Sequence, residues 1–90
     1  MPEQTVTLNN AYGLHARPAT LFVETSNRFV SDVLVVRDGQ EVNGKSIMGI
    51  MMLGAENGAT LTIRTTGEDA DKALEALVTL VESGFGENGQ

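Results

Sequence analysis

The chain has 90 residues, of which 41% are hydrophobic, and this length suits one compact core rather than two domains. Its net charge of −6 opposes both the phosphate backbone of nucleic acids and an anionic membrane surface, so we expect no nucleic-acid partner and no membrane insertion. The absence of cysteine excludes a disulfide framework, and with a single histidine we expect neither a metal site nor a cofactor. No apolar run reaches the roughly 20 residues of a membrane span, and the first residues do not resemble a signal peptide, so we expect a cytoplasmic protein.

The first half of the chain predicts a strand, a helix and a hairpin. Residues 5–8 alternate between polar and apolar, which is the period of a strand with one buried face. Apolar positions at helical spacing predict an amphipathic helix over 16–27, with His15 at its N-terminal edge. Residues 32–37 are apolar and β-branched, and Asp38-Gly39 supplies the positive φ angles of a tight hairpin that returns through 40–42.

The second half predicts a short helix, a strand and a longer helix. Ser46 can cap a short helix over 47–53, and residues 59–65 alternate as a strand with Leu61 and Ile63 facing inward. An apolar stripe predicts a helix from 70 to 81, with Thr66 and Asp69 as a capping pair at its start. Gly84 should end this helix, residue 85 should fold back on its end, and a flexible tail should begin at about residue 86.

This order of elements, βαββαβα, predicts the fold class. Four mostly antiparallel strands with polar residues on one side need cover on the other side, and three helices can provide it. We therefore expect a single domain over residues 1–90 with an α+β fold, an open-faced two-layer sandwich whose sheet is covered on one face by three helices. The order of the strands within the sheet does not follow from the sequence.

The segment Gly-Leu-His-Ala-Arg-Pro-Ala at residues 13–19 carries the chemistry of greatest interest. A helix start presents unpaired backbone N–H groups and the positive end of the helix dipole, both of which favour an anion. Arg17 adds a charged donor fork suited to phosphate oxygens, and Pro18 stiffens the first turn. These parts suit an imidazole that accepts a phosphoryl group and passes it on. Residue types alone also fit an ordinary surface or capping histidine at His15 and a solvated surface charge at Arg17.

The wider pattern narrows these alternatives. The segment at 13–19, preceded by Asn10 and joined by Lys-Ser-Ile-Met-Gly at 45–49, closely resembles HPr, the histidine-containing phosphocarrier of the bacterial phosphoenolpyruvate:sugar phosphotransferase system. The resemblance covers residues 5–84 and implies an open-faced sandwich. It further implies that His15 takes phosphate on Nδ1 from Enzyme I and donates it to sugar-specific IIA components, with Arg17 assisting the phosphate. The implied protein is a stoichiometric carrier, not an enzyme, and we expect a monomer.

Ser46 has two interpretations. As a helix N-cap it accepts a backbone hydrogen bond worth ~1 kcal/mol, and this role alone would explain a serine here. The string at 45–49 also resembles the site at which HPr kinase/phosphorylase uses ATP to phosphorylate HPr in some bacteria, although a serine occurs here in members from organisms without that kinase. A phosphate at a helix N-terminus would leave the fold intact and make the nearby surface negative. The Ser46-phosphorylated form could then bind a transcription regulator, which is our second hypothesis.

Three methionines between residues 48 and 52 exceed what one face of a short helix can bury, so part of this segment should be exposed. The alternative is that all its apolar residues are core, which we accept for Ile50 and Leu53 only. In the family, residues around Ile47, Met48 and Met51 form the surface that meets Enzyme I and IIA proteins.

Two features depart from the commonest family pattern. Tyr12 stands where relatives often have a smaller polar residue; it could shield the phosphohistidine, tune partner choice or have no special role, and we favour the last. Ser-Gly-Phe at 83–85 is similar to nitrogen-type paralogues of HPr, which use the same histidine in a regulatory phosphorelay. A nitrogen-type carrier therefore remains an alternative pathway.

Overall fold

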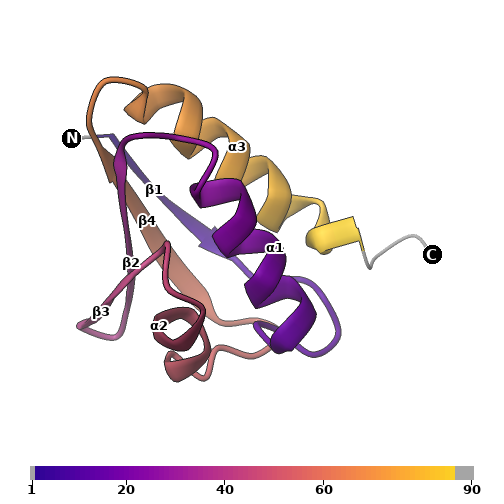
Figure 1. Cartoon of the computed structure of the whole chain (residues 1–90). Coiled ribbons are helices and arrows are strands. Elements are labelled where there is room, and N and C mark those ends of the chain that lie inside the picture. The colour runs from indigo at the N-terminus through magenta and orange to yellow at the C-terminus, as the bar shows by residue number, and fades with distance from the viewer. Residues whose placement is uncertain (1, 87–90) are drawn as a thin grey trace.

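The structure is a computed structural model that describes residues 2–86, and it has the α+β architecture predicted from the sequence (Figure 1). The elements follow in the order β1 (Glu3–Thr7), α1 (Ala16–Ser26), β2 (Asp32–Arg37), β3 (Gln40–Asn43), α2 (Ile47–Met52), β4 (Thr60–Thr66) and α3 (Ala70–Glu82). A single 3₁₀ turn over Gly84–Gly86 follows α3. Most of the predicted tail, residues 87–90, lies outside the described residues.

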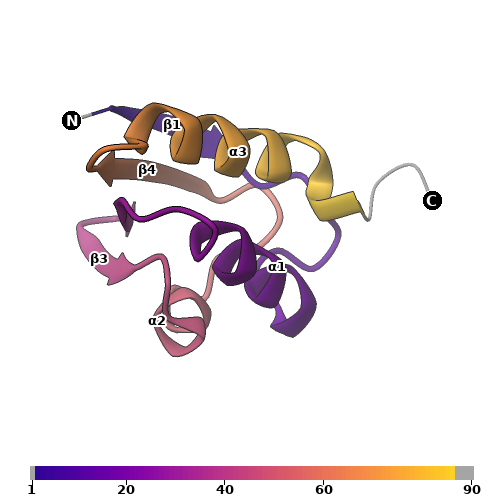
Figure 2. The same cartoon turned by 45° about the horizontal axis from the view of Figure 1, so that its top comes forward.

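The four strands form one antiparallel sheet in the order β1-β4-β2-β3. The alternation seen in the sequence fixes the register, because it sets Val6 opposite Leu61 and Val35 opposite Ile63 on the buried face. The three helices cover this face, and α1 and α3 pack side by side (Figure 2). The open-faced two-layer sandwich is thus confirmed.

The core lies between the sheet and the helices. Leu61 and Ile63 are buried as predicted, and the apolar stripes of α1 and α3 meet them from the other layer. The largest fully buried apolar side chains are Leu8, Phe22, Val35, Ile50, Leu61, Ile63, Leu77 and Val81. Phe85 is also buried, which confirms that the chain folds back onto the core after α3.

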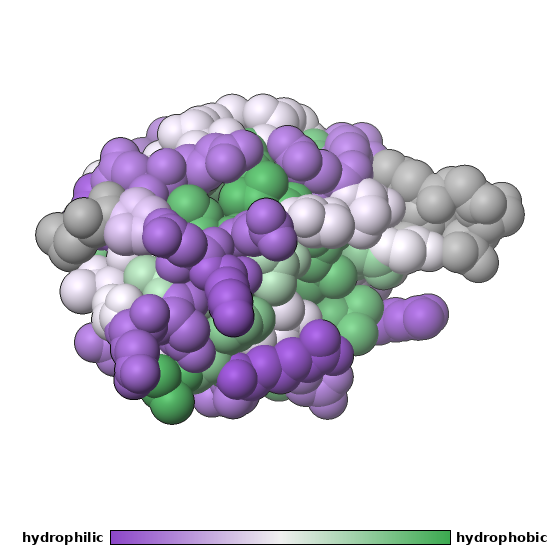
Figure 3. All heavy atoms as spheres, turned by 90° about the horizontal axis from the view of Figure 1, so that it is seen from above, coloured by the Kyte–Doolittle hydropathy of each residue, from purple (hydrophilic) through white to green (hydrophobic). Residues whose placement is uncertain are grey.

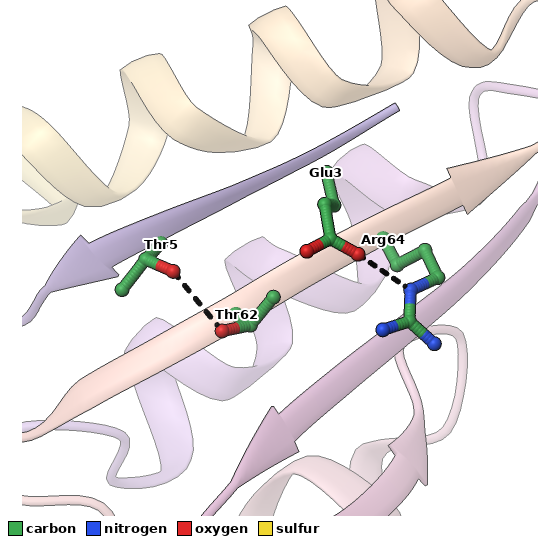
Figure 4. A network of polar contacts seen from close by, with 4 residues as sticks. All are labelled: Glu3, Thr5, Thr62 and Arg64. Atoms are coloured by element: carbon green, nitrogen blue, oxygen red, sulfur yellow. Dashed lines mark hydrogen bonds and ion pairs between the residues drawn. The ribbon is translucent and has the colours of Figure 1, made fainter. Parts of the chain in front are cut away.

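The other face of the sheet is open and polar. On it, the Thr5 and Thr62 hydroxyls lie 3.1 Å apart and Arg64 donates to Glu3 at 2.9 Å across the β1–β4 pair (Figure 4). The face of the molecule seen from above in Figure 3 carries hydrophilic residues, with hydrophobic residues visible between them. Among residues 2–86, no helix has the length and apolar character needed to cross a membrane.

The predicted capping pair at the start of α3 is wrong. Thr66 is the last residue of β4, whereas Asp69 is the N-cap of α3 but makes no side-chain hydrogen bond within the helix. The Asp69 carboxylate instead accepts hydrogen bonds from the backbone N–H groups of Val30 and Ser31 and from the Ser31 hydroxyl. The Asp69 carboxylate thus binds the loop between α1 and β2, whereas its spacing from Thr66 predicted a cap of the helix.

Other boundaries differ by a few residues. β1 begins at Glu3, two residues before the predicted strand, because it stays paired with Arg64. Residue 86 is the last residue of the 3₁₀ turn. The hairpin is confirmed, since Asp38 and Gly39 have φ angles of 50° and 82°.

Candidate functional site

The loop between β1 and α1 is held by its own hydrogen bonds before the histidine is reached. The buried Asn10 side chain donates to the Gly13 carbonyl at 2.7 Å, and the Gly13 N–H donates to the Asn10 carbonyl at 3.3 Å. The Leu14 N–H donates to the carbonyl of Ala55 at 2.9 Å, which ties the loop to the segment that follows α2. The backbone that carries the histidine is therefore fixed on both sides.

Residue 13 has to be a glycine, because its surroundings leave no room for a Cβ atom. Its φ is +64°, and a Cβ atom there would lie 2.3 Å from the Ala55 carbonyl oxygen. Only glycine combines that backbone conformation with so close an approach. The segment at 13–19 therefore begins with a glycine because its loop packs closely against the loop that contains Ala55.

His15 is the N-cap residue of α1. Its carbonyl accepts the first helical hydrogen bond, from the Ala19 N–H at 2.9 Å, while its half-buried side chain makes no capping hydrogen bond. The interpretation of His15 as a side-chain cap is therefore wrong. The imidazole therefore belongs to the residue at the N-terminus of α1 but does not cap the helix.

The first turn of α1 concentrates donors near this imidazole. The N–H groups of Ala16 and Arg17 precede the first intrahelical bond, and Pro18 has no N–H to add. The first turn contains no acidic residue to offset the helix dipole, and Arg17 is exposed in this turn. Pro18 is fully buried, which anchors the turn on the core. The arrangement can hold an anion beside His15.

Tyr12 contacts the histidine, although the sequence favoured no special role for this residue over shielding of the histidine. The centroids of the two rings are 5.7 Å apart and the rings are nearly perpendicular, at 86°. The Tyr12 side chain is otherwise 78% exposed. An aromatic residue three positions before the histidine was the available signal.

Ser46 is the N-cap of α2, as predicted. Its hydroxyl oxygen accepts a hydrogen bond from the Gly49 N–H at 3.1 Å. The turn before it is also fixed, because the Asn43 side chain accepts from the Lys45 N–H at 2.8 Å and the Lys45 ammonium donates to the Phe29 carbonyl at 2.8 Å. Ser46 is half-buried and its oxygen is already engaged in the cap.

The predicted split of α2 into a core face and an exposed face is confirmed. Ile50 and Leu53 are buried, at 0% and 4% exposure. The exposed apolar residues of α2, which we call the α2 patch, are Ile47, Met48, Met51 and Met52. Such a patch on a small protein is typical of an interaction surface.

The fold brings the histidine and the α2 patch to the same end of the molecule. α2 packs against α1, and the bond from Leu14 to Ala55 joins their flanking loops, so the start of α1 lies beside α2 (Figures 1 and 2). Between residues 2 and 86, no group of three His, Cys, Asp or Glu side chains is placed to hold a metal ion. The site is thus a histidine, an arginine and a helix start next to an apolar surface.

The family model described as the phosphorylation site of the HPr component of the phosphotransferase system matches residues 2–83. The chain therefore belongs to the HPr family, whose members are phosphocarriers and not enzymes.

The individual relatives include both phosphocarrier proteins named HPr and HPr-like proteins named Crh. The HPr-like protein Crh of Bacillus subtilis is 48% identical over 91% of this chain and 96% of its own length. The phosphocarrier protein HPr of Cupriavidus necator is 42% identical over 97% of this chain and 98% of its own length. The crystal structure of HPr from Thermoanaerobacter tengcongensis matches with a TM-score of 0.95 and 49% identity, covering 98% of this chain and 99% of that one. Dimers of HPr and of Crh also occur among the solved structures.

Proposed function

We propose that this chain is a phosphocarrier of the sugar phosphotransferase system, in which His15 accepts a phosphoryl group from phospho-Enzyme I and passes it to IIA components. One observation carries the proposal: His15 is the N-cap of α1 and its side chain makes no capping hydrogen bond, so the N–H groups of the first turn are not taken up by the imidazole and can serve an incoming anion. The carrier is cytoplasmic and monomeric in this proposal. No cofactor takes part.

The chemistry needs only the residues of the first turn of α1. A neutral His15 imidazole attacks the phosphorus through Nδ1; the new N–P bond forms as the bond from phosphorus to the donor group breaks, and the donor keeps that electron pair. The N–H groups of Ala16 and Arg17 and the guanidinium of Arg17 stabilise the three phosphoryl oxygens. Transfer to a IIA component repeats the step in reverse, with His15 as the leaving group.

The α2 patch is the docking surface in this proposal. Ile47, Met48 and Met51 contact Enzyme I and the IIA components in turn, and flexible methionine side chains adapt to partners of different shape. Because α2 packs against α1, a partner docked on the patch would also reach the histidine. A small exposed patch also favours release after each transfer.

The direct test is incubation with phosphoenolpyruvate and Enzyme I. We expect one acid-labile phosphate per chain, absent from His15→Ala. Arg17→Ala should lower kcat/KM by about tenfold or more, since a charge-assisted hydrogen bond is lost. Arg28→Ala, which removes an exposed arginine beyond the far end of the same helix, is the matched control and should have no effect. An unmodified wild-type chain in the presence of a competent Enzyme I would refute the proposal.

A second function, regulation through Ser46, is favoured by the Crh relatives. The solution structure of Bacillus subtilis Crh is described as that of the catabolite repression HPr, and it is 48% identical to this chain. Phosphorylation of Ser46 would put a dianion at the start of α2, beside Ile47 and Met48 of the patch. Its oxygens would take over the bond from the Gly49 N–H while their charge repels an acidic partner.

The Ser46 proposal has its own assay. HPr kinase/phosphorylase and ATP should give an acid-stable phosphate that is absent from Ser46→Ala, and the phosphorylated chain should react more slowly with Enzyme I. It should also gain affinity for a transcription regulator of catabolite repression. No modification by an active kinase would leave Ser46 as a helix cap alone.

The pathway and the oligomeric state are tested separately. Reaction with nitrogen-type IIA proteins but not with sugar-specific ones would favour the alternative suggested by Ser-Gly-Phe at 83–85. Sedimentation equilibrium should give the mass of one chain, and a mass of two chains would make this protein resemble the dimeric relatives.

A further inference from the structure

Tyr12 is an unusual place for a large aromatic side chain. It is 78% exposed, so it adds little to the core, and its closest described ring neighbour is the imidazole of His15. The centroid distance of 5.7 Å and the angle of 86° fall in the range that edge-to-face aromatic pairs prefer. The contact is therefore an attractive one with a defined geometry.

Hydrogen bonds on either side of Tyr12 fix the loop backbone that carries it. Asn10 and Gly13 bond to each other on either side of Tyr12, and the next residue is bonded to Ala55. The other surroundings of the ring are open, since Tyr12 lines a shallow hollow with Ala11, Glu56 and Asn57. Because the backbone at Tyr12 is fixed and its ring is largely exposed, the contact with the imidazole favours one orientation of the ring.

We propose that Tyr12 is a positioning residue, whose ring holds the His15 imidazole in the orientation that meets the incoming phosphoryl group. The inference rests on the proposed phosphocarrier function and adds a residue to it. In-line transfer needs the attacking nitrogen aligned at ~3–3.5 Å from phosphorus, so an imidazole that samples several orientations reacts more slowly. The edge-to-face contact reduces that sampling before a partner arrives.

Three variants distinguish the effect of the aromatic ring from the effects of the hydroxyl group and of side-chain size. Tyr12→Phe keeps the ring, Tyr12→Leu keeps an apolar side chain of similar reach, and Tyr12→Ser removes both. Because Tyr12 is exposed, all three should unfold at the wild-type temperature, which thermal denaturation checks.

The first measurement does not depend on any partner. In NMR spectra of the free protein, His15 side-chain three-bond couplings should report one dominant rotamer in the wild type and in Tyr12→Phe, and averaged values in the Leu and Ser variants. The ring-current shift on the imidazole protons should disappear in the same two variants. Unchanged couplings in Tyr12→Leu and Tyr12→Ser would overturn the proposal.

The second measurement is the rate of phosphorylation by Enzyme I. We expect kcat/KM to fall by about two- to tenfold in the Leu and Ser variants, the range that an aromatic pair energy of this kind supports, with Tyr12→Phe close to wild type. Wild-type rates in the Leu and Ser variants, or an equal loss in Tyr12→Phe, would contradict a role for the ring. If the wild type itself is not phosphorylated, the phosphocarrier function fails, and the NMR couplings still decide whether Tyr12 orients His15.

Discussion

At the scale of single residues, the site depends on a glycine that carries no chemistry. Gly13 lets the backbone turn at a positive φ and come into contact with the Ala55 carbonyl, which sets the direction from which His15 enters α1. The imidazole, the arginine and the free N–H groups are useful only in that orientation. Gly13 therefore belongs to the site although its atoms would never touch a phosphate.

Gly13→Ala should damage both the fold and the transfer. The left-handed backbone alone costs about 1–2 kcal/mol for a residue with a Cβ, and the overlap with Ala55 adds to this. Gly54→Ala is the matched control, since its φ of +59° is similar and no atom lies within 4 Å of the added carbon. We expect denaturant unfolding to show a clearly larger loss for Gly13→Ala. Equal losses in the two variants would mean that the close approach to Ala55 has no energetic weight.

At this scale local helix rules predicted that His15 and Arg17 stand at the start of α1 and that Ser46 caps α2, whereas their roles as site residues were implied by the resemblance to HPr. The Ser46 cap follows from residue type and spacing within four residues. The sequence offers a role for Tyr12 beside His15 only as one of three alternatives, since the contact depends on how a loop turns. The adjacency of His15 to the α2 patch likewise requires tertiary packing of α1 on α2.

At the scale of elements, Asp69 joins two parts of the fold that are distant in sequence. Its carboxylate accepts from the Ser31 hydroxyl and from two N–H groups of the same loop, while its own N–H donates back to the Ser31 hydroxyl at 3.1 Å. The start of α3 is thus fastened to the loop between α1 and β2. Sequence spacing could not predict this link because its two halves lie 38 residues apart.

The hydrogen bond from the Ser31 hydroxyl, aided by the N–H groups of Val30 and Ser31, lowers the pKa of Asp69 below its usual 3.8 despite partial desolvation. A lowered folded-state pKa means that the ionised carboxylate stabilises the fold above pH 3.8. That contribution is lost as the pH falls below 3.8 and through the folded value.

We therefore expect Asp69→Asn to be less stable than the wild type near neutral pH, with the difference shrinking in acid. Urea denaturation at several pH values measures this. Asp71→Asn, which removes an exposed carboxylate from the first turn of the same helix, is the control for helix-dipole effects. A stability gap between Asp69→Asn and wild type that stays constant down to pH 2 would contradict this role of the carboxylate.

At the scale of the whole molecule, the core is closed from both ends of the described chain. Val6 and Leu8 enter it near the start, and Phe85 enters it from the 3₁₀ turn after α3. Phe85 is 3% exposed and adopts a φ of +57°, an uncommon angle for a bulky residue. The burial of the ring offsets the strain of the backbone.

Phe85→Ala should remove much of the stability of the domain. Truncating a buried phenylalanine costs about 3–5 kcal/mol, against about 5–15 kcal/mol for a typical domain. Phe85→Leu should recover a good part of the loss, because it refills most of the cavity. A melting temperature for Phe85→Ala within a degree or two of wild type would show that the 3₁₀ turn does not seal the core.

The strand order has a consequence for how the chain is made. β4 is the inner strand that pairs with both β1 and β2, yet it spans Thr60–Thr66, late in the chain. During synthesis β1 is therefore made well before β4, the one strand that it pairs with among residues 2–86. In that interval the histidine loop lacks its hydrogen bond to Ala55, so it can reach the conformation seen here only after the segment that follows α2 has been made.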